Sequence, residues 1–233
     1  MVIFFVLLLA LQLGCGPQPS SEGPSELARP ATEIPGNAEL PSQATEDPRP
    51  LIVAFGDSLT AGHGLRPGQS YPDFLQQELD RKGYVYKVRN EGISGDTTSA
   101  GLVRLGVVAR LNPEFVIVAF GGNDGLRGLA PGSMKDNLRE IVTALKKDGA
   151  SIVLAGMKLP PNYGREYTES FEAVFHELAE ETDTPLIPFL LEGVGGYPEL
   201  MQEDGVHPNV EGTRKVALYV MEHLEPLLDE PRP

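Results

Sequence analysis

The chain has almost no cysteine and comparatively little positive charge. Its 233 residues include a single cysteine, Cys15, which excludes an intrachain disulfide and a metal site built on several cysteines. Nineteen Lys and Arg residues stand against 33 Asp and Glu residues, and the formal net charge is −14. Because no basic cluster is present to contact phosphates, nucleic acid is not expected as a partner. The acidity is instead expected to favour solubility.

Long apolar runs are also missing beyond the N-terminus, so the body of the chain is not expected to cross a membrane. Residues 1–14 are almost wholly apolar and predict a signal peptide. Their Leu-Gln-Leu-Gly ending before Cys15 resembles a bacterial lipobox, from which Gln12 and the lack of an initial Lys or Arg depart. We expect Cys15 to be lipidated, giving a membrane-anchored lipoprotein of the cell envelope that faces the periplasm. The alternative is an ordinary cleaved signal peptide and a secreted, soluble protein.

Residues 15–50 predict a linker. They hold eight prolines and six acidic residues but few aliphatic ones. Such a segment cannot bury enough apolar surface to offset the entropy lost on ordering, and its prolines favour an extended, semi-rigid chain. The linker would hold the predicted globular domain, residues 51–230, away from a membrane, or it would simply be an unstructured leader.

From Leu51 onward, apolar strand-like runs alternate with helical segments. Strands are predicted at residues 51–55, 84–89, 115–120, 151–155 and 185–188. Helices are predicted at residues 71–82, 99–111, 133–147, 165–182 and 210–228. Ser133 and Asp136 suit a capping pair at the start of the third helix. The alternation predicts an α/β fold made of parallel βαβ units with right-handed crossovers.

Four glycine-containing loops follow predicted strands, at residues 56–59, 90–98, 121–124 and 204–208. The carboxyl ends of parallel strands lie along one edge of a sheet, so these loops can converge on one crevice. Ser58 comes directly after the buried strand that begins at Leu51. Open α/β sheets place their active sites at this position, and we interpret Ser58 as a nucleophile.

A serine hydroxyl needs a base that takes its proton, and the chain offers four histidines. His176 and His223 fall within predicted helices and are expected at the surface, whereas His63 could line the entrance of a pocket. His207 lies three residues after Asp204 in a loop bounded by Gly and Pro. The carboxylate of Asp204 can therefore hold one imidazole nitrogen and leave the other free, as an aspartate does in a serine triad.

Acyl transfer also needs fixed hydrogen-bond donors for the oxyanion. The candidates are the backbone N–H groups of Ser58 and Gly95 and the side-chain amide of Asn123. Glycine at position 95 would let the backbone approach a substrate closely. Asp57 and Asp124 are interpreted as structural acceptors of loop amides. This chemistry requires neither a metal ion nor a cofactor.

The four loops resemble the sequence blocks of the SGNH (GDSL) hydrolase superfamily, which is named after four residues of these blocks. In this chain they correspond to Ser58, Gly95, Asn123 and His207, and Asp204 completes the triad. The resemblance covers nearly all of the chain from Leu51 to Leu228. The Gly-x-Ser-x-Gly elbow of α/β-hydrolases is not matched, because the last glycine of that motif is missing.

Residues 121–128 and 159–164 resemble more closely the bacterial thioesterase I, lysophospholipase and arylesterase branch. This implies a flavodoxin-like, three-layer α/β/α sandwich with a central, mostly parallel, five-stranded sheet. It implies a serine esterase that cleaves carboxylic ester or thioester bonds of a small-molecule ester or lipid through an acyl-enzyme. The loop at about 125–131 is expected to shift when acyl chains bind. A carbohydrate O-acetylesterase and an acyltransferase on the same scaffold are the alternatives, and a non-catalytic binding module is disfavoured because all five site residues are present.

Overall fold

The computed structural model describes residues 47–229. The predicted signal peptide, Cys15 and most of the predicted linker lie outside these residues. The strands are β1 (Leu51–Gly56), β2 (Lys87–Gly92), β3 (Phe115–Ala119), β4 (Ser151–Ala155) and β5 (Leu186–Ile187). The α-helices are α1 (Ser58–Ala61), α2 (Tyr71–Lys82), α3 (Thr98–Ala109), α4 (Gly122–Leu126), α5 (Pro131–Lys147), α6 (Arg165–Thr182) and α7 (Val210–Leu224). Short 3₁₀ turns are η1 (Pro161–Tyr163), η2 (Pro198–Leu200) and η3 (Glu225–Leu227).

The five strands form one sheet in the order β2-β1-β3-β4-β5, and every pairing is parallel. The central strands β1 and β3 are buried almost throughout, which is why their sequences are continuous apolar runs. Gly56 at the end of β1 pairs with Gly92 of β2 and Ala119 of β3. The loops that follow these three strands therefore leave the sheet at the same level.

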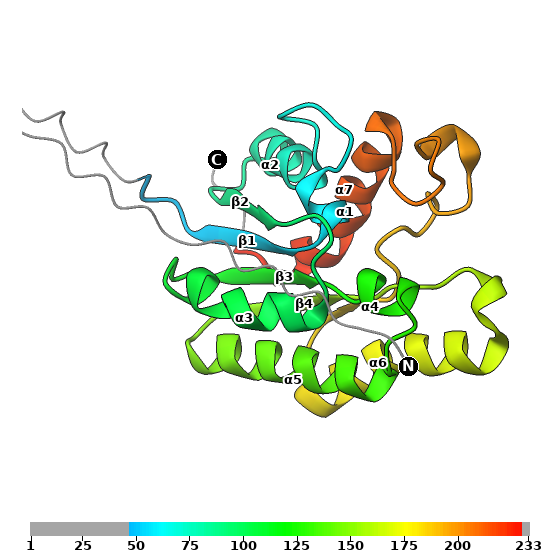
Figure 1. Cartoon of the computed structure of the whole chain (residues 1–233). Coiled ribbons are helices and arrows are strands. Elements are labelled where there is room, and N and C mark those ends of the chain that lie inside the picture. The colour runs from blue at the N-terminus through cyan, green and yellow to red at the C-terminus, as the bar shows by residue number, and fades with distance from the viewer. Residues whose placement is uncertain (1–46, 230–233) are drawn as a thin grey trace, which may run out of the picture. The chain divides into compact units, whose positions relative to one another are not determined.

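Helices cover both faces of the sheet (Figure 1). Helices α1, α2 and α7 lie on one face, and α3, α5 and α6 lie on the other. Helix α5 shows how the sequence makes this layer, since its apolar residues recur at helical spacing and are all buried: Met134, Leu138, Ile141, Val142 and Leu145. The predicted α/β/α sandwich is thus confirmed, with a sheet that is wholly rather than mostly parallel.

Several element ends differ from the prediction. Helix α5 begins at Pro131 and has Ala130 at its N-cap without a side-chain cap, so the predicted capping pair is wrong. A proline in the first turn already has the backbone angle that the helix needs. Helix α7 ends at Leu224, because Pro226 cannot continue it, and the chain goes on into η3. No helix within residues 47–229 combines the length and apolarity that a membrane span requires.

Candidate active site

Ser58 is the first residue of α1, a four-residue helix that starts directly after β1. The sequence suggested only a turn here. Asp57 is the N-cap of this helix, and its Oδ1 accepts the Leu59 N–H at 3.1 Å. The first N–H groups of a helix have no partner within the helix. The fold therefore presents the Ser58 hydroxyl and the Ser58 N–H together at the end of the central strand.

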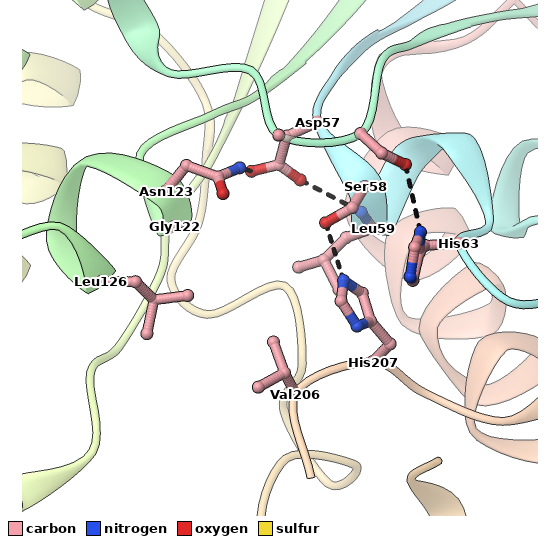
Figure 2. Close-up of a pocket in the computed structure, with 11 residues that line it drawn as sticks. Asp57, Ser58, Leu59, His63, Gly122, Asn123, Leu126, Val206 and His207 are labelled. Carbon is pink, nitrogen blue, oxygen red and sulfur yellow. Dashed lines mark hydrogen bonds between the residues drawn. The ribbon is translucent and has the colours of Figure 1, made fainter. Parts of the chain in front are cut away.

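The side chains of Ser58, His207 and Asp204 form a continuous hydrogen-bonded row. Figure 2 shows the part of this row that joins Ser58 to His207. The Ser58 Oγ lies 2.9 Å from the His207 Nε2, and the His207 Nδ1 lies 2.6 Å from the Asp204 Oδ2. Because Nδ1 faces a carboxylate, it carries the proton in the neutral ring and leaves Nε2 as an acceptor for the serine hydroxyl. Ser58 and His207 are 149 positions apart in the chain, and the fold brings them and Asp204 into contact.

Asp204 is held in its ionised form by its own loop. Its Oδ1 accepts the backbone N–H groups of Val206 at 2.9 Å and His207 at 3.0 Å. The backbone hydrogen bond from His207 is the main cause that lowers the pKa of Asp204 to about 2, with the His207 ring and Val206 adding to it. The loop does not follow β5 directly, because residues 188–203, including η2, lie in between.

The residues of all three predicted oxyanion donors, Ser58, Gly95 and Asn123, line one pocket. Among residues 47–229, no backbone acceptor takes the N–H of Ser58 or that of Gly95. Gly95 has a φ of +88°, a conformation that favours glycine. Asn123 lies in the short helix α4 rather than in a loop, and its Nδ2 donates to the Asp96 carbonyl at 2.9 Å and to the Asp57 Oδ2 at 3.3 Å.

Asp57 and Asp124 are both buried and both accept hydrogen bonds from neighbouring segments. Burial raises the pKa of Asp57 to about 6, against the opposing effect of the Leu59 N–H. Asp124 accepts the backbone N–H of Thr98 at 2.9 Å and the Thr98 hydroxyl at 2.6 Å, which joins α4 to the start of α3. These contacts agree with the interpretation of both residues as structural acceptors.

A cavity of about 240 Å³ opens above Ser58. Its lining combines the polar groups described above with aliphatic side chains from three segments, namely Leu59, Leu126 and Val206. His63 also lines it, and its ring contacts the ring of His207. The sequence alone indicates only weakly that His63 lines a pocket, since a loop position carries little information. Within residues 47–229, no group of three or more His, Cys, Asp or Glu side chains could hold a metal ion.

A model of the GDSL-like lipase/acylhydrolase family matches residues 54–215, which is well over half of the chain. The chain belongs to this family. Esterase TesA of Pseudomonas aeruginosa is 42% identical over 178 residues, which cover 76% of this chain and 89% of that protein. The Escherichia coli K12 protein named thioesterase 1/protease 1/lysophospholipase L1 is 39% identical over 179 residues, covering 76% of this chain and 85% of the relative.

A crystal structure of TesA has the same fold. It covers 77% of this chain and 100% of its own, with a TM-score of 0.74 at 42% sequence identity. The family and its relatives establish this chain as a hydrolase that acts on ester bonds. The resemblance seen in the four loops is confirmed at this level.

Proposed function

We propose that the protein is a serine esterase that hydrolyses carboxylic ester and thioester bonds through Ser58, His207 and Asp204. The observation that carries this proposal is the row of hydrogen bonds from Ser58 Oγ to Asp204 Oδ2. As Ser58 Oγ attacks the substrate carbonyl carbon, His207 Nε2 takes the hydroxyl proton and then gives it to the leaving alcohol or thiol. Water, deprotonated by the same nitrogen, releases the acid from the acyl-enzyme and restores Ser58.

The oxyanion of each tetrahedral intermediate would be held by the N–H groups of Ser58 and Gly95 and by the Asn123 amide. The two backbone donors are ready, because they have no backbone acceptor within the described residues. One hydrogen of the Asn123 amide donates to the Asp96 carbonyl at 2.9 Å. The other makes the longer contact to Asp57, at 3.3 Å, which would hold the amide in position in the free enzyme and would be replaced by the oxyanion.

For the substrate we infer an acyl ester of the arylesterase, lysophospholipase or acyl-thioesterase type. Two observations support this class. The relative from Escherichia coli carries the names thioesterase and lysophospholipase. Leu59, Leu126 and Val206 also give the cavity an aliphatic wall that suits the hydrocarbon part of an acyl group.

The decisive experiment is the Ser58→Ala variant assayed with p-nitrophenyl esters and with a fluorophosphonate probe. Loss of the nucleophile should lower kcat by about 10⁶-fold, because the residues of a serine triad act as a unit. The wild type should be labelled by the probe at Ser58, whereas the variant should not. Near-wild-type hydrolysis by the variant would overturn the assignment.

A panel of p-nitrophenyl esters from acetyl to palmitoyl, together with acyl-CoA and lysophospholipid, tests the substrate class. The aliphatic wall predicts that kcat/KM rises with acyl length beyond acetyl. A strict preference for acetyl groups would favour the O-acetylesterase alternative. If adding an alcohol acceptor diverted most product into a new ester, the acyltransferase alternative would replace hydrolysis.

We further propose that Cys15 is lipidated and anchors the enzyme in the cell envelope, facing the periplasm. The support is the lipobox-like sequence before the chain's one cysteine and the proline-rich segment after it. Labelled palmitate should enter the wild-type protein, and the Cys15→Ser variant should be unlabelled and lost from the membrane fraction. An unlabelled wild type recovered in the soluble fraction would support the secreted alternative.

A further inference from the structure

His63 places a second imidazole against the ring of His207. The ring centroids are 4.5 Å apart and the ring planes are inclined by 41°. Both side chains are drawn in Figure 2. Both nitrogens of His207 are already engaged along the ring edge, by Ser58 and by Asp204. His63 is the aromatic side chain that packs against this ring, in a tilted arrangement.

The backbone of His63 is bonded both to the helix that carries Ser58 and to the segment that leads to His207. Its N–H donates to the Ser58 carbonyl at 3.1 Å, which ties it to the nucleophile helix. Its carbonyl accepts the Gln202 Nε2 at 2.7 Å, and the same amide donates to the Pro208 carbonyl at 2.9 Å. Gly64 has a φ of +76°, a conformation that favours glycine, and a side chain there would displace the Gln202 amide. The His63 ring is thus held beside the loop that carries the base.

The His63 ring has a polar neighbour in a third segment of the site. Its Nδ1 lies 3.5 Å from the Ser94 Oγ, in the segment that also carries Gly95. Charged groups near the imidazole pair include Asp204, which contacts His207 Nδ1, and Asp57, which interacts electrostatically with His207. Arg127 donates to the Gly95 carbonyl at 2.8 Å. The pair has its negative partner at Asp204, on the edge of His207 that faces away from Ser58.

We propose that His63 is a positioning residue that supports the general base through an aromatic contact. This inference rests on the proposed function, in which His207 becomes an imidazolium while Ser58 attacks. A neutral aromatic ring attracts a cation placed against its face. His63 therefore stabilises the imidazolium and keeps the His207 ring directed at Ser58. A positively charged group in its place would oppose the same step.

Three substitutions at this position separate shape from charge. His63→Phe supplies an uncharged aromatic ring, His63→Arg supplies a flat group that is permanently charged, and His63→Ala removes the contact. With p-nitrophenyl butyrate at pH 8, we expect kcat to stay within about threefold for Phe and to fall by about fivefold for Ala. For Arg we expect kcat about tenfold below that of Phe, because a permanent positive charge would then lie close to the imidazolium. KM should change by less than about twofold in all three variants.

The salt dependence of kcat distinguishes the proposed effect of charge from a purely structural role of His63. Raising the ionic strength to about 1 M shortens the screening length to about 3 Å, so the gap between the Arg and Phe variants should narrow. His176→Phe and His176→Arg, on the exposed face of α6, are the matched controls and should show neither effect. Equal kcat for the Arg and Phe variants, or a higher KM with unchanged kcat, would overturn the proposal. Ser58→Ala, run in the same assay, shows separately whether the proposed function itself fails.

Discussion

Asp57 and Asp204 lie in one site but in opposite electrostatic settings. Asp57 is 2% exposed, and burial raises its pKa to about 6. The side chain of Asp204 is 43% exposed, and hydrogen bonds from its own loop lower its pKa to about 2. The acid next to the nucleophile in sequence is thus the one that ionises with difficulty, whereas the acid far along the chain stays ionised.

This difference supports the two proposed roles. A triad acid must be negative when the imidazolium forms, and Asp204 satisfies that condition at any pH at which the enzyme is expected to work. Asp57 instead uses its oxygens to hold parts of the framework, the Leu59 N–H and the Asn123 amide. Proximity to the serine in sequence is therefore a poor guide to the triad acid. A better guide is whether the hydrogen bonds that stabilise the ionised carboxylate outweigh the burial that destabilises it.

The largest expected effect comes from Asp204→Asn. The amide cannot stabilise the imidazolium of His207 and favours the wrong tautomer, so kcat should fall by about 10⁴-fold with the fold intact. The measurement is kcat on a p-nitrophenyl ester, with circular dichroism to verify folding. Glu203→Gln, at the exposed neighbouring position, is the matched control and should retain wild-type activity. A loss of less than tenfold for Asp204→Asn would assign the triad acid elsewhere.

Asp57→Asn should have a smaller effect on catalysis. An amide at this position cannot accept from both Leu59 and Asn123 with its two side-chain atoms, so the Asn123 donor should lose its orientation. We expect kcat to fall by about 10²-fold, near the lower end for loss of one oxyanion donor. Combining the change with Asn123→Ala tests the route in a double-mutant cycle. If the two losses multiplied independently, Asp57 would not act through Asn123.

The two acids should also affect stability with opposite pH dependence. The folded state raises the pKa of Asp57 from 3.8 to about 6, so its ionisation destabilises the fold as pH rises through this range. Because asparagine cannot ionise, the unfolding free energy of Asp57→Asn relative to wild type should increase by about 2 kcal/mol from pH 4 to pH 8. Urea denaturation at a series of pH values measures this difference.

Asp204 provides the contrast in the same measurement. The pKa of Asp204 is lowered from 3.8 to about 2, so its contribution to stability is present above pH 3.8 and is lost only in stronger acid. The difference between Asp204→Asn and wild type should therefore stay nearly constant from pH 4 to pH 8. A pH-independent difference for Asp57→Asn as well would mean that Asp57 is no harder to ionise in the folded state than in the unfolded one.

Much of the fold could be predicted because burial leaves a strong pattern. Strands β3 and β4 read as apolar runs, and α2 and α6 have the predicted bounds. Strand β2 was placed too early, because Tyr84 and Tyr86 are buried in the core ahead of an edge strand that is itself largely polar. Helices α1 and α4 were missed, since four or five residues carry no helical period and depend on contacts such as the Asp57 cap.

The candidate site divides in the same way. Its reacting groups could be named because few side-chain types can act as nucleophile, base and acid, and because the loops that carry them follow strands of one sheet. The contacts that hold His63 in place could not be predicted, because Gln202, which bonds to its carbonyl, lies 139 positions away in the chain. Such a contact depends on how two loops pack, which no spacing in the sequence records.

The smallest expected effect concerns Gly205, which lies in the exposed loop that carries Asp204, in contrast to the buried surroundings of Asp57. Gly205 has a φ of +66°, and a side chain added there would meet no atom within 4 Å. Gly205→Ala should therefore cost only backbone strain, about 1 kcal/mol or roughly 3 °C in Tm, with kcat changed less than about twofold. Gly205→Asn should cost less, because asparagine adopts this conformation more readily. A large fall in kcat for Gly205→Ala would mean that the loop changes conformation, and that the pair formed by Asp204 and His207 depends on this one left-handed residue.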